Sequence, residues 1–338
     1  MTAPLSCIIG LSGQRLKKTE SVFLRDANPW GVILFARNVK SPDQLRRLTG
    51  DIRDATGRNT LIFIDQEGGR VQRMRPPHWR AFPSGDAYAN IYRRDQDEGR
   101  RACFLGHRLI ANDLRAVGIT SDCAPVLDLP QPGADPIISD RALGNSVEAI
   151  VDMAHAAMAG LMSGGVAPVI KHIPGHGRAT VDSHKALPKI NATREVLEKS
   201  DFLPFRKLSD APMAMTAHAV YTHNSRSAVT ISRRALTELI RAAIGFDGLL
   251  MTDDLDMKAL SGDLTKKTER ALSAGCDIAL QCSGRLADSV KVAKGAKHLS
   301  GRAFERAMIA DNCAEHVSSF DREAAEAEFD ALMAVAAA

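Results

Sequence analysis

The chain has 338 residues, of which 45% are hydrophobic and 25% are charged, and its formal net charge is +4. This composition is ordinary for a globular protein with a full core, and the basic residues alternate with acidic ones, which favours solvated helix faces over a nucleic-acid patch. The apolar run at 5–11 is too short for a signal peptide or a membrane span, and six scattered cysteines without a CxxC pair predict reduced thiols. We therefore expect a cytoplasmic protein with neither a nucleic-acid nor a membrane partner.

Eight short apolar runs recur along the chain at fairly even spacing. They span residues 5–10, 31–36, 61–64, 123–127, 166–170, 213–216, 249–252 and 277–281. Near-continuous apolar runs of this length are typical of parallel strands that are buried on both faces. Helix-like stretches lie between most of them, at 42–48, 105–117, 149–162 and 232–240. Ser232 is a plausible N-cap for the last of these, and Gly118, Gly165 and Gly245 are plausible C-caps.

This alternation of strands and helices predicts an α/β fold, a single (β/α)8 barrel of the TIM type. We expect one catalytic barrel domain over residues 1–338, with a C-terminal helix in the Ala/Glu-rich stretch at 322–338. A doubly wound open sheet is the alternative, but no GxGxxG sequence follows any of the runs.

Acids, bases and cations follow five of the apolar runs. These residues are Asp65 and Glu67, Asp128, Lys171 and His172, His218, and Asp253 and Asp254. In a barrel the C-terminal strand ends form one rim, and active sites lie there. A single polar residue at such a position is often only a turn former or a helix cap, but five sets together predict an active site.

The densest of these sets lies at 171–184, which holds three of the ten histidines. Asp182 stands two residues before His184, and a carboxylate beside an imidazole orients the ring and favours a protonated donor. Asp253 ends an apolar strand and could act as a nucleophile or as a charge stabiliser. One fixed anion and one mobile acid are what glycoside cleavage needs, although a histidine would here replace the usual second carboxylate.

A metal site is the competing interpretation of the same residues. His172 and His176 are four residues apart, and His184, His218 and Asp253 could complete a ligand set. Pro174 and Gly175 keep the first pair off a helix face, however, and the spacing matches no zinc pattern. We expect neither a metal nor a cofactor.

The stretch at 171–184, Lys-His-Ile-Pro-Gly-His-Gly-x4-Asp-Ser-His, resembles the β-N-acetylglucosaminidases of glycoside hydrolase family 3. The Asp-Ser-His loop separates these enzymes from the β-glucosidases of the family. Further similar stretches lie at 64–73, 124–128, 139–141, 215–218 and 252–257, so the resemblance extends along nearly the whole chain. The length is similar to that of the single-domain bacterial form, a cytoplasmic enzyme of peptidoglycan recycling.

The resemblance implies a role for each matching residue. Asp253 would be the nucleophile that forms a glycosyl-aspartate, and His184, paired with Asp182, would be the general acid and then the general base. Sugar hydroxyls and the N-acetyl group would be bound by Asp65, Arg73, Arg141, Lys171 and His172. His176 would organise the loop, with Gly175 and Gly177 as its hinges, and the loop would close over the substrate.

Taken without the resemblance, several of these residues have simpler interpretations. Arg73 and Arg141 could be surface ion-pair partners, and His218 is as consistent with a satisfied core histidine as with a site residue. For Asp128 and Asp140 we favour turn formation. Asp254 is the rival of Asp253 as nucleophile, but adjacent strand residues point to opposite faces, so we expect only one of them in the site.

The predicted function is that of a retaining exo-β-N-acetylglucosaminidase. Its substrates would be small sugars of the 1,6-anhydro-muropeptide type, such as N-acetylglucosaminyl-1,6-anhydro-N-acetylmuramic acid with or without an attached peptide. Two alternatives remain open: a phosphorylase that uses the same site, because a histidine acid tolerates an incoming phosphate anion, and a non-catalytic sugar-binding barrel.

Overall fold

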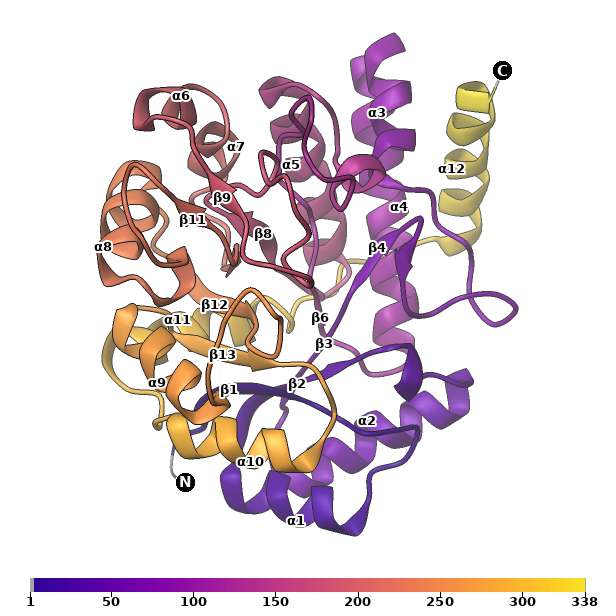
Figure 1. Ribbon diagram of the computed structural model, residues 1–338. Helices are drawn as coiled ribbons and strands as arrows, with labels where there is room; N and C mark the ends of the chain where they lie inside the picture. The colour runs from indigo at the N-terminus through magenta and orange to yellow at the C-terminus, as the bar shows by residue number, and fades with distance from the viewer. Residues whose placement is uncertain (1–2, 338) are drawn as a thin grey trace.

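A closed parallel barrel forms the centre of the molecule, whose computed structural model describes residues 3–337 (Figure 1). The sheet has nine strands in the order β7-β6-β3-β2-β1-β13-β12-β10-β8. Its two outermost strands, β7 (Ala167–Pro168) and β8 (Ile170–Ile173), are consecutive in the chain and separated only by Val169. The two edges of the sheet are therefore one interrupted strand, and the barrel closes with eight strands.

The other barrel strands are β1 (Leu5–Gly10), β2 (Pro29–Leu34), β3 (Leu61–Ile64), β6 (Ser121–Asp122), β10 (Met213–Thr216), β12 (Leu249–Asp254) and β13 (Ile278–Gln281). Each pairs with its neighbours in parallel. The predicted (β/α)8 barrel is thus confirmed, and the doubly wound alternative is wrong.

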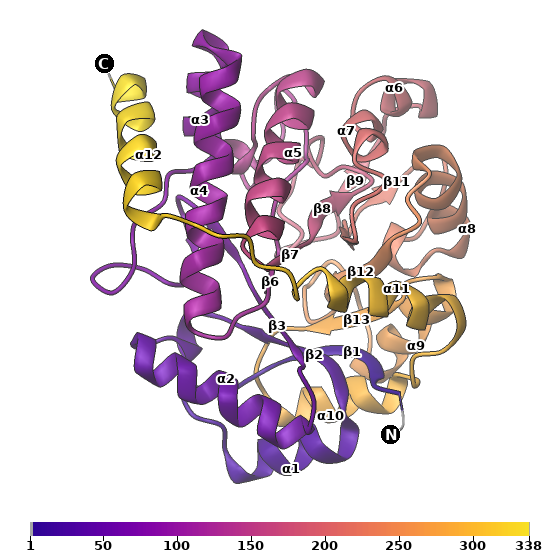
Figure 2. The ribbon, with the colours of Figure 1, turned by 180° about the vertical axis from the view of Figure 1, so that it is seen from behind.

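Helices surround the barrel and follow every strand (Figures 1 and 2). They are α1 (Lys18–Ala27), α2 (Pro42–Thr56), α3 (Gly85–Arg94), α4 (Gln96–Ala116), α5 (Val147–Ser163), α6 (Arg194–Lys199), α7 (Phe202–Lys207), α8 (Arg233–Ala235), which continues as a π-helix over Leu236–Ile244, α9 (Leu264–Ala274), α10 (Leu286–Gly295), α11 (Gly301–Asn312) and α12 (Arg322–Ala337). Two short two-stranded sheets pair β4 (Gln66–Gly68) with β5 (Val71–Gln72) and β9 (Lys189–Ile190) with β11 (Val220–Tyr221).

Local sequence explains where these helices begin and end. Ser232 Oγ accepts the backbone N–H of Ala235 at 3.3 Å, as its predicted capping role requires. Gly245 ends the same helical segment with φ of +81°, a backbone conformation that glycine adopts without steric cost. None of the helices in the described part of the chain combines the length and the apolar character of a membrane span.

Alternating side chains divide the core into two layers. Along β1, Ile8 points into the barrel, where Phe63 and Met251 also lie, whereas Cys7 and Ile9 pack under the helices. Both layers are mostly aliphatic or sulfur-containing, in keeping with the 5% aromatic content. This filled barrel is a rigid base for the side chains at its rim.

The fourth strand differs most from the sequence prediction. We expected it at 123–127, but ladder pairing is confined to β6 at Ser121–Asp122, followed by one isolated bridge between Val126 and Lys171. Pro125 has no N–H to donate and so interrupts the ladder in the middle of the predicted run. The strand at 249–252 is conversely longer, since β12 extends to Asp254 and carries both aspartates.

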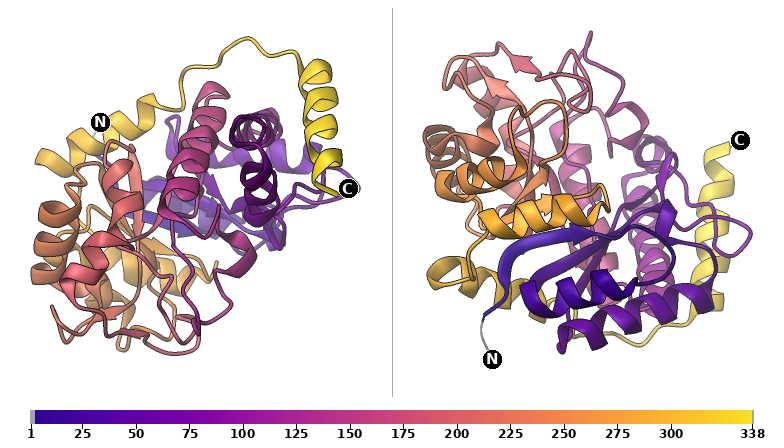
Figure 3. Two further views of the ribbon diagram at one scale, coloured as in Figure 1. Left: turned by 90° about the horizontal axis from the view of Figure 1, so that it is seen from above. Right: turned by 60° about the horizontal axis from the view of Figure 1, so that its bottom comes forward.

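The C-terminal helix predicted at 322–338 is observed as α12, and residue 338 lies outside the described residues. The connection from α11 runs across the outside of the helix layer, and α12 lies against α3 and α4 (Figures 2 and 3). Phe329 anchors α12 by burying its ring beside Phe82 and Tyr88.

Candidate active site

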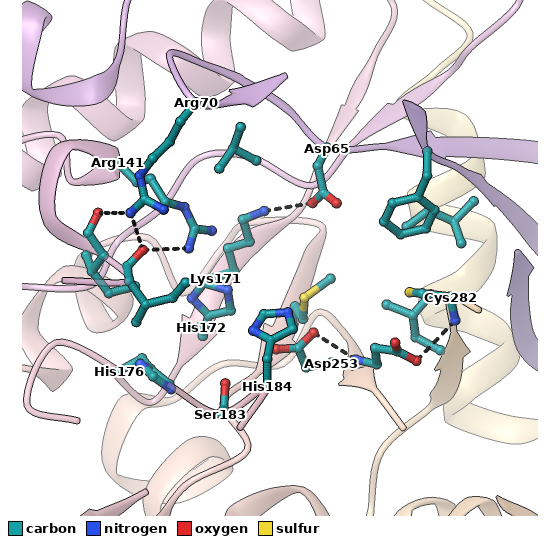
Figure 4. A pocket seen from close by; sticks show the side chains of 18 of the residues that line it. Asp65, Arg70, Arg141, Lys171, His172, His176, Ser183, His184, Asp253 and Cys282 are labelled. Carbon is teal, nitrogen blue, oxygen red and sulfur yellow. Dashed lines mark hydrogen bonds and ion pairs between the residues drawn. The ribbon is translucent and has the colours of Figure 1, made fainter. Parts of the chain in front are cut away.

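A cavity of about 180 Å³ opens at the C-terminal ends of the barrel strands (Figure 4). Its lining includes eight of the residues predicted for the site: Asp65, Arg73, Arg141, Lys171, His172, His176, His184 and Asp253. These residues are as much as 188 positions apart in sequence, between Asp65 and Asp253, and the barrel rim brings them together. Asp182, Gly175 and Gly177 do not line the cavity but support residues that do.

A network of four charged side chains lies at one wall of the cavity, and three of them line it. Lys171 is 1% exposed, and its Nζ lies 3.0 Å from Asp65 Oδ1 and 2.6 Å from Glu67 Oε1. Arg141 donates two hydrogen bonds of 2.8 Å to the two oxygens of Glu67. Arg141, whose side chain is 10% exposed, is therefore not the surface ion-pair partner of the simpler interpretation. The same holds for Arg73, which lines the cavity and pairs with Asp65 there.

The carboxyl groups of this network are ionised. Burial opposes the charge of Asp65, but Lys171 and Arg73, whose Nη2 donates to Asp65 Oδ2 at 2.9 Å, hold the pKa of that carboxyl well below its usual range. Burial likewise opposes the charge of Glu67, yet Arg141 and Lys171 lower its pKa to about 2. Fixed charges of both signs can donate strong hydrogen bonds to the hydroxyl groups of a ligand and accept them in return.

His172 is oriented by Asp128, which is fully buried. Asp128 Oδ2 lies 2.6 Å from His172 Nδ1, and Asp128 Oδ1 accepts the backbone N–H groups of His172 at 3.2 Å and of His176 at 2.6 Å. Burial opposes its charge, but the neighbouring imidazoles lower the pKa of Asp128 below its ordinary value. We favoured a turn former at this position, and that interpretation is wrong, because the carboxylate positions a lining imidazole.

Asp140, for which we also favoured turn formation, lies in the 3-10 turn Ser139–Arg141. Its Oδ1 accepts a hydrogen bond of 2.7 Å from Nε of Arg70, which lines the cavity. The residue therefore belongs to a turn and pairs with a lining arginine as well.

Asp253 and Asp254 both line the cavity, contrary to the expectation that only one of them would. The reason is local: the register between β12 and β13 shifts between Met251 and Asp254, so strict alternation fails there. Asp254 Oδ1 accepts the backbone N–H groups of Asp256 and Cys282, both at 3.1 Å, and ties the ends of the two strands together.

The two carboxyl groups differ in charge. Burial opposes ionisation of Asp253, but the imidazoles of His218 and His172 and a 2.7 Å hydrogen bond from the Asp254 backbone N–H lower its pKa below the ordinary value. Burial raises the pKa of Asp254 to about 6. Asp253 is thus the more firmly ionised member of the pair, as a nucleophile has to be.

The Asp182–His184 pair is formed as predicted. His184 Nδ1 lies 2.8 Å from Asp182 Oδ1, which also accepts the backbone N–H of His184 at 2.8 Å. Burial opposes the charge of Asp182, but these bonds hold its pKa below the ordinary value. His184 lines the same cavity as Asp253 while its side chain is 65% exposed, so its Nε2 is accessible for proton exchange (Figure 4).

The base of this loop is firmly anchored. A Cβ on Gly177 would lie 1.9 Å from the carbonyl oxygen of Leu129, so close packing requires glycine there. Gly175 has φ of +132°, and Arg178 Nε donates to the buried Asp201 at 2.7 Å. The hinge role of the two glycines stays a prediction, whereas the need for glycine at both positions follows from the backbone.

His218 lies outside the cavity lining and is a satisfied core histidine. Its Nδ1 is 2.8 Å from Thr230 Oγ1 and its Nε2 is 3.0 Å from the carbonyl oxygen of Asp254. It therefore supports the strand end that carries the aspartates. Within residues 3–337, no three His, Cys, Asp or Glu side chains are grouped as metal ligands.

Three functional positions were missed or undervalued at the level of sequence: Glu67, Asp128 and Ser183, which lines the cavity between the members of the dyad. Glu67 was already among the strand-end residues, and its place beside Asp65 could have been predicted, since it stands two residues later and so on the same side of an extended chain. Ser183 lies in the Asp-Ser-His stretch, but nothing in the sequence gives its own side chain a role.

Fold and site together define a class, the (β/α)8-barrel glycoside hydrolases, in which an ionised carboxylate and a proton donor share one rim cavity. Comparison with known families agrees with this class: residues 6–317 match the model described as glycosyl hydrolase family 3 N terminal domain. The chain belongs to glycosyl hydrolase family 3, within the group of its β-hexosaminidases.

Individual relatives support the assignment over most of the chain. A beta-hexosaminidase of Alkalilimnicola ehrlichii is 40% identical over 280 residues, which cover 82% of this chain and 80% of the relative. A beta-hexosaminidase of Bordetella avium is 36% identical over 83% of this chain and 81% of its own length. The crystal structure of NagZ from Neisseria gonorrhoeae in complex with N-trifluoroacetyl-D-glucosamine is similar with a TM-score of 0.85 and 30% identity, covering 99% of this chain and 98% of that one.

Proposed function

We propose that this protein is a retaining exo-β-N-acetylglucosaminidase with Asp253 as nucleophile and His184, paired with Asp182, as acid and base. The observation that carries the proposal is the shared cavity, lined by a carboxylate with a lowered pKa and by an accessible imidazole bound to its own carboxylate. The first group can attack a sugar carbon, and the second can protonate the leaving oxygen.

The reaction would proceed in two balanced steps. In the first, an Asp253 oxygen bonds to the anomeric carbon, the glycosidic bond breaks, and His184 Nε2 gives its proton to the leaving oxygen. In the second, His184 takes a proton from water, the water oxygen bonds to the same carbon, and the bond to Asp253 breaks. Two inversions give net retention, and both steps use only side chains of this chain.

Substrate recognition is assigned to Asp65, Arg73, Arg141, Lys171 and His172. Their charged and oriented groups line the cavity and are held in place by Glu67 and Asp128. Such preorganised partners select a sugar by the positions of its hydroxyl and amide groups. The N-trifluoroacetyl-D-glucosamine bound by the Neisseria gonorrhoeae relative supports an N-acylated glucosamine in this cavity.

We further propose that the whole chain is one catalytic unit that works in the cytoplasm on 1,6-anhydro-muropeptide-type sugars of cell-wall recycling. All six cysteines are unpaired and four of them are buried, which fits a reducing compartment. The similarity to the NagZ structure, which covers 99% of this chain and 98% of that one, supports a single barrel unit. The proposed substrate class rests on the family motifs in the sequence.

The decisive assay measures release of nitrophenol from 4-nitrophenyl β-N-acetylglucosaminide by the wild type, Asp253→Asn and His184→Ala, with the exposed Asp210→Asn as matched control. We expect turnover in the wild type and control and near-complete loss in Asp253→Asn. The first product seen by NMR should be the β-anomer of N-acetylglucosamine, and phosphate should not change the rate. Phosphate-dependent release of a sugar phosphate would instead identify a phosphorylase. Release of N-acetylglucosamine from its disaccharide with 1,6-anhydro-N-acetylmuramic acid tests the substrate class.

A further inference from the structure

We propose that His176 is a positioning residue that holds the catalytic loop by a hydrogen bond with Ser183. The inference rests on the proposed function, because it concerns how the Asp182–His184 pair is placed over the cavity. It assigns a role in the reaction to Ser183, whose own side chain had been given none within the Asp-Ser-His stretch, and it makes the role of His176 specific.

His176 has a fixed but unused imidazole. His176 is 4% exposed, and both nitrogens of its ring are buried without a hydrogen-bond partner among the described residues. Burial lowers the pKa of His176 to about 4, so the ring is neutral at physiological pH and offers one donor and one acceptor. Two unpartnered buried nitrogens are costly, so a side chain that satisfies one of them would stabilise the ring in its place.

The main chain of His176 cannot easily move toward a distant partner. Its backbone N–H is held by Asp128 at 2.6 Å, and the flanking Gly175 and Gly177 are packed against Asp201 and Leu129. The imidazole is therefore an anchor, and its partner has to come to it.

Ser183 is the partner that the geometry offers. It lines the same cavity and is 4% exposed. Its carbonyl oxygen accepts the backbone N–H of Ala259 at 3.2 Å, whereas its hydroxyl has no hydrogen-bond partner among residues 3–337. Figure 4 places its side chain between those of His176 and His184. A hydroxyl can donate to one ring nitrogen or accept from the other, so it matches either tautomer of His176.

A bond between these two side chains would act on both neighbours of Ser183 at once. Asp182 and His184 flank it in sequence, and His184 is the most exposed of the three at 65% of its side chain. Pinning Ser183 to the anchored imidazole would reduce the freedom of the dyad and favour the geometry in which His184 faces the glycosidic oxygen. The bond thus contributes to the chemical step rather than to ground-state sugar binding.

The test is a double-mutant cycle on 4-nitrophenyl β-N-acetylglucosaminide with His176→Phe, Ser183→Ala and the double variant, with His176→Gln as a conservative rescue. Each single variant should lower kcat roughly 10-fold and leave KM within about 2-fold, which is the effect of losing one hydrogen bond made in the transition state. The double variant should be no slower than the slower single variant, and His176→Gln should recover most of the rate. The exposed Thr180→Ala on the same loop is the matched control and should keep wild-type kcat.

The opposite results overturn the proposal. Multiplicative losses in the double variant would show that the two side chains act independently, and a raised KM in His176→Phe alone would show that the ring binds the sugar instead. If His176→Phe fails to fold by circular dichroism, Ser183→Ala and His176→Gln decide through their kcat values. Failure of the proposed function is distinguishable, because the wild type itself would then not turn over the substrate.

Discussion

Replacing Glu67 by glutamine should destabilise the protein by about 3 kcal/mol at neutral pH. Glutamine keeps the shape of the side chain but removes the charge that faces Lys171 at 2.6 Å and Arg141 at 2.8 Å. Both cations are largely buried, with side chains 2% and 10% exposed, so water cannot replace the lost carboxylate.

The magnitude follows from the pKa of Glu67. The folded protein lowers it from 4.5 to about 2, and each unit corresponds to roughly 1.4 kcal/mol, which gives about 3 kcal/mol for the ionised form. Because the folded pKa is depressed, this stabilisation is complete above pH 4.5 and is lost as the pH falls toward 2. The difference between wild type and Glu67→Gln should therefore be constant at neutral pH and shrink below pH 4.5.

Urea unfolding followed by circular dichroism, repeated at several pH values, measures this difference. The exposed Glu323→Gln on α12 is the matched control and should leave the free energy of unfolding unchanged within about 0.5 kcal/mol. A Glu67→Gln loss below 0.5 kcal/mol at pH 7, or a loss that does not shrink in acid, would refute the claim that this buried carboxylate stabilises the site.

Three further predictions use other parts of the structure. Gly177→Ala should cost about 3 kcal/mol or more in urea unfolding, since its Cβ would lie 1.9 Å from the Leu129 carbonyl oxygen; unchanged stability would mean that the backbone yields easily there. Asp128→Asn should lower kcat/KM roughly 10- to 100-fold while the fold is kept, because His172 loses a charged hydrogen bond of 2.6 Å; wild-type kinetics would remove Asp128 from the site. Burial lowers the pKa of His107 from 6.5 to about 4. The contribution of this neutral imidazole to the free energy of unfolding is therefore complete above pH 6.5 and is lost as the pH falls to 4. His107→Phe should flatten that part of the stability–pH curve by up to about 3 kcal/mol, and an unchanged slope would contradict the shift.

Much of the fold could be predicted because buried parallel strands leave a direct trace in the sequence. Three of the eight apolar runs, at 5–10, 61–64 and 213–216, coincide with the observed strands. The run at 123–127, the fourth along the chain, does not coincide with a strand, since Pro125 removes a ladder donor within a run that otherwise looks like a strand. Apolar character locates a buried segment, but hydrogen-bond pairing decides which of its residues form the strand.

The candidate site was predictable to the extent that its residues follow strands. Asp65, Lys171, His172 and Asp253 could be placed at one rim because the barrel aligns all C-terminal strand ends. The supporting partners were harder to find, because a carboxylate such as Asp128 looks like a turn former until its distance to an imidazole is known. The register shift that brings Asp254 to the cavity depends on two strands at once and leaves no mark on either sequence.

The most direct test of the account is to trap the covalent intermediate on His184→Ala with 2,4-dinitrophenyl β-N-acetylglucosaminide. This leaving group departs without protonation, so the first step proceeds, whereas the second step lacks its base and the intermediate accumulates. Mass spectrometry of quenched, digested protein should find one N-acetylhexosaminyl group on the peptide that carries Asp253, on that residue, and none in His184→Ala combined with Asp253→Asn. An adduct on Asp254, or no adduct while dinitrophenol is released in a burst, would contradict the account.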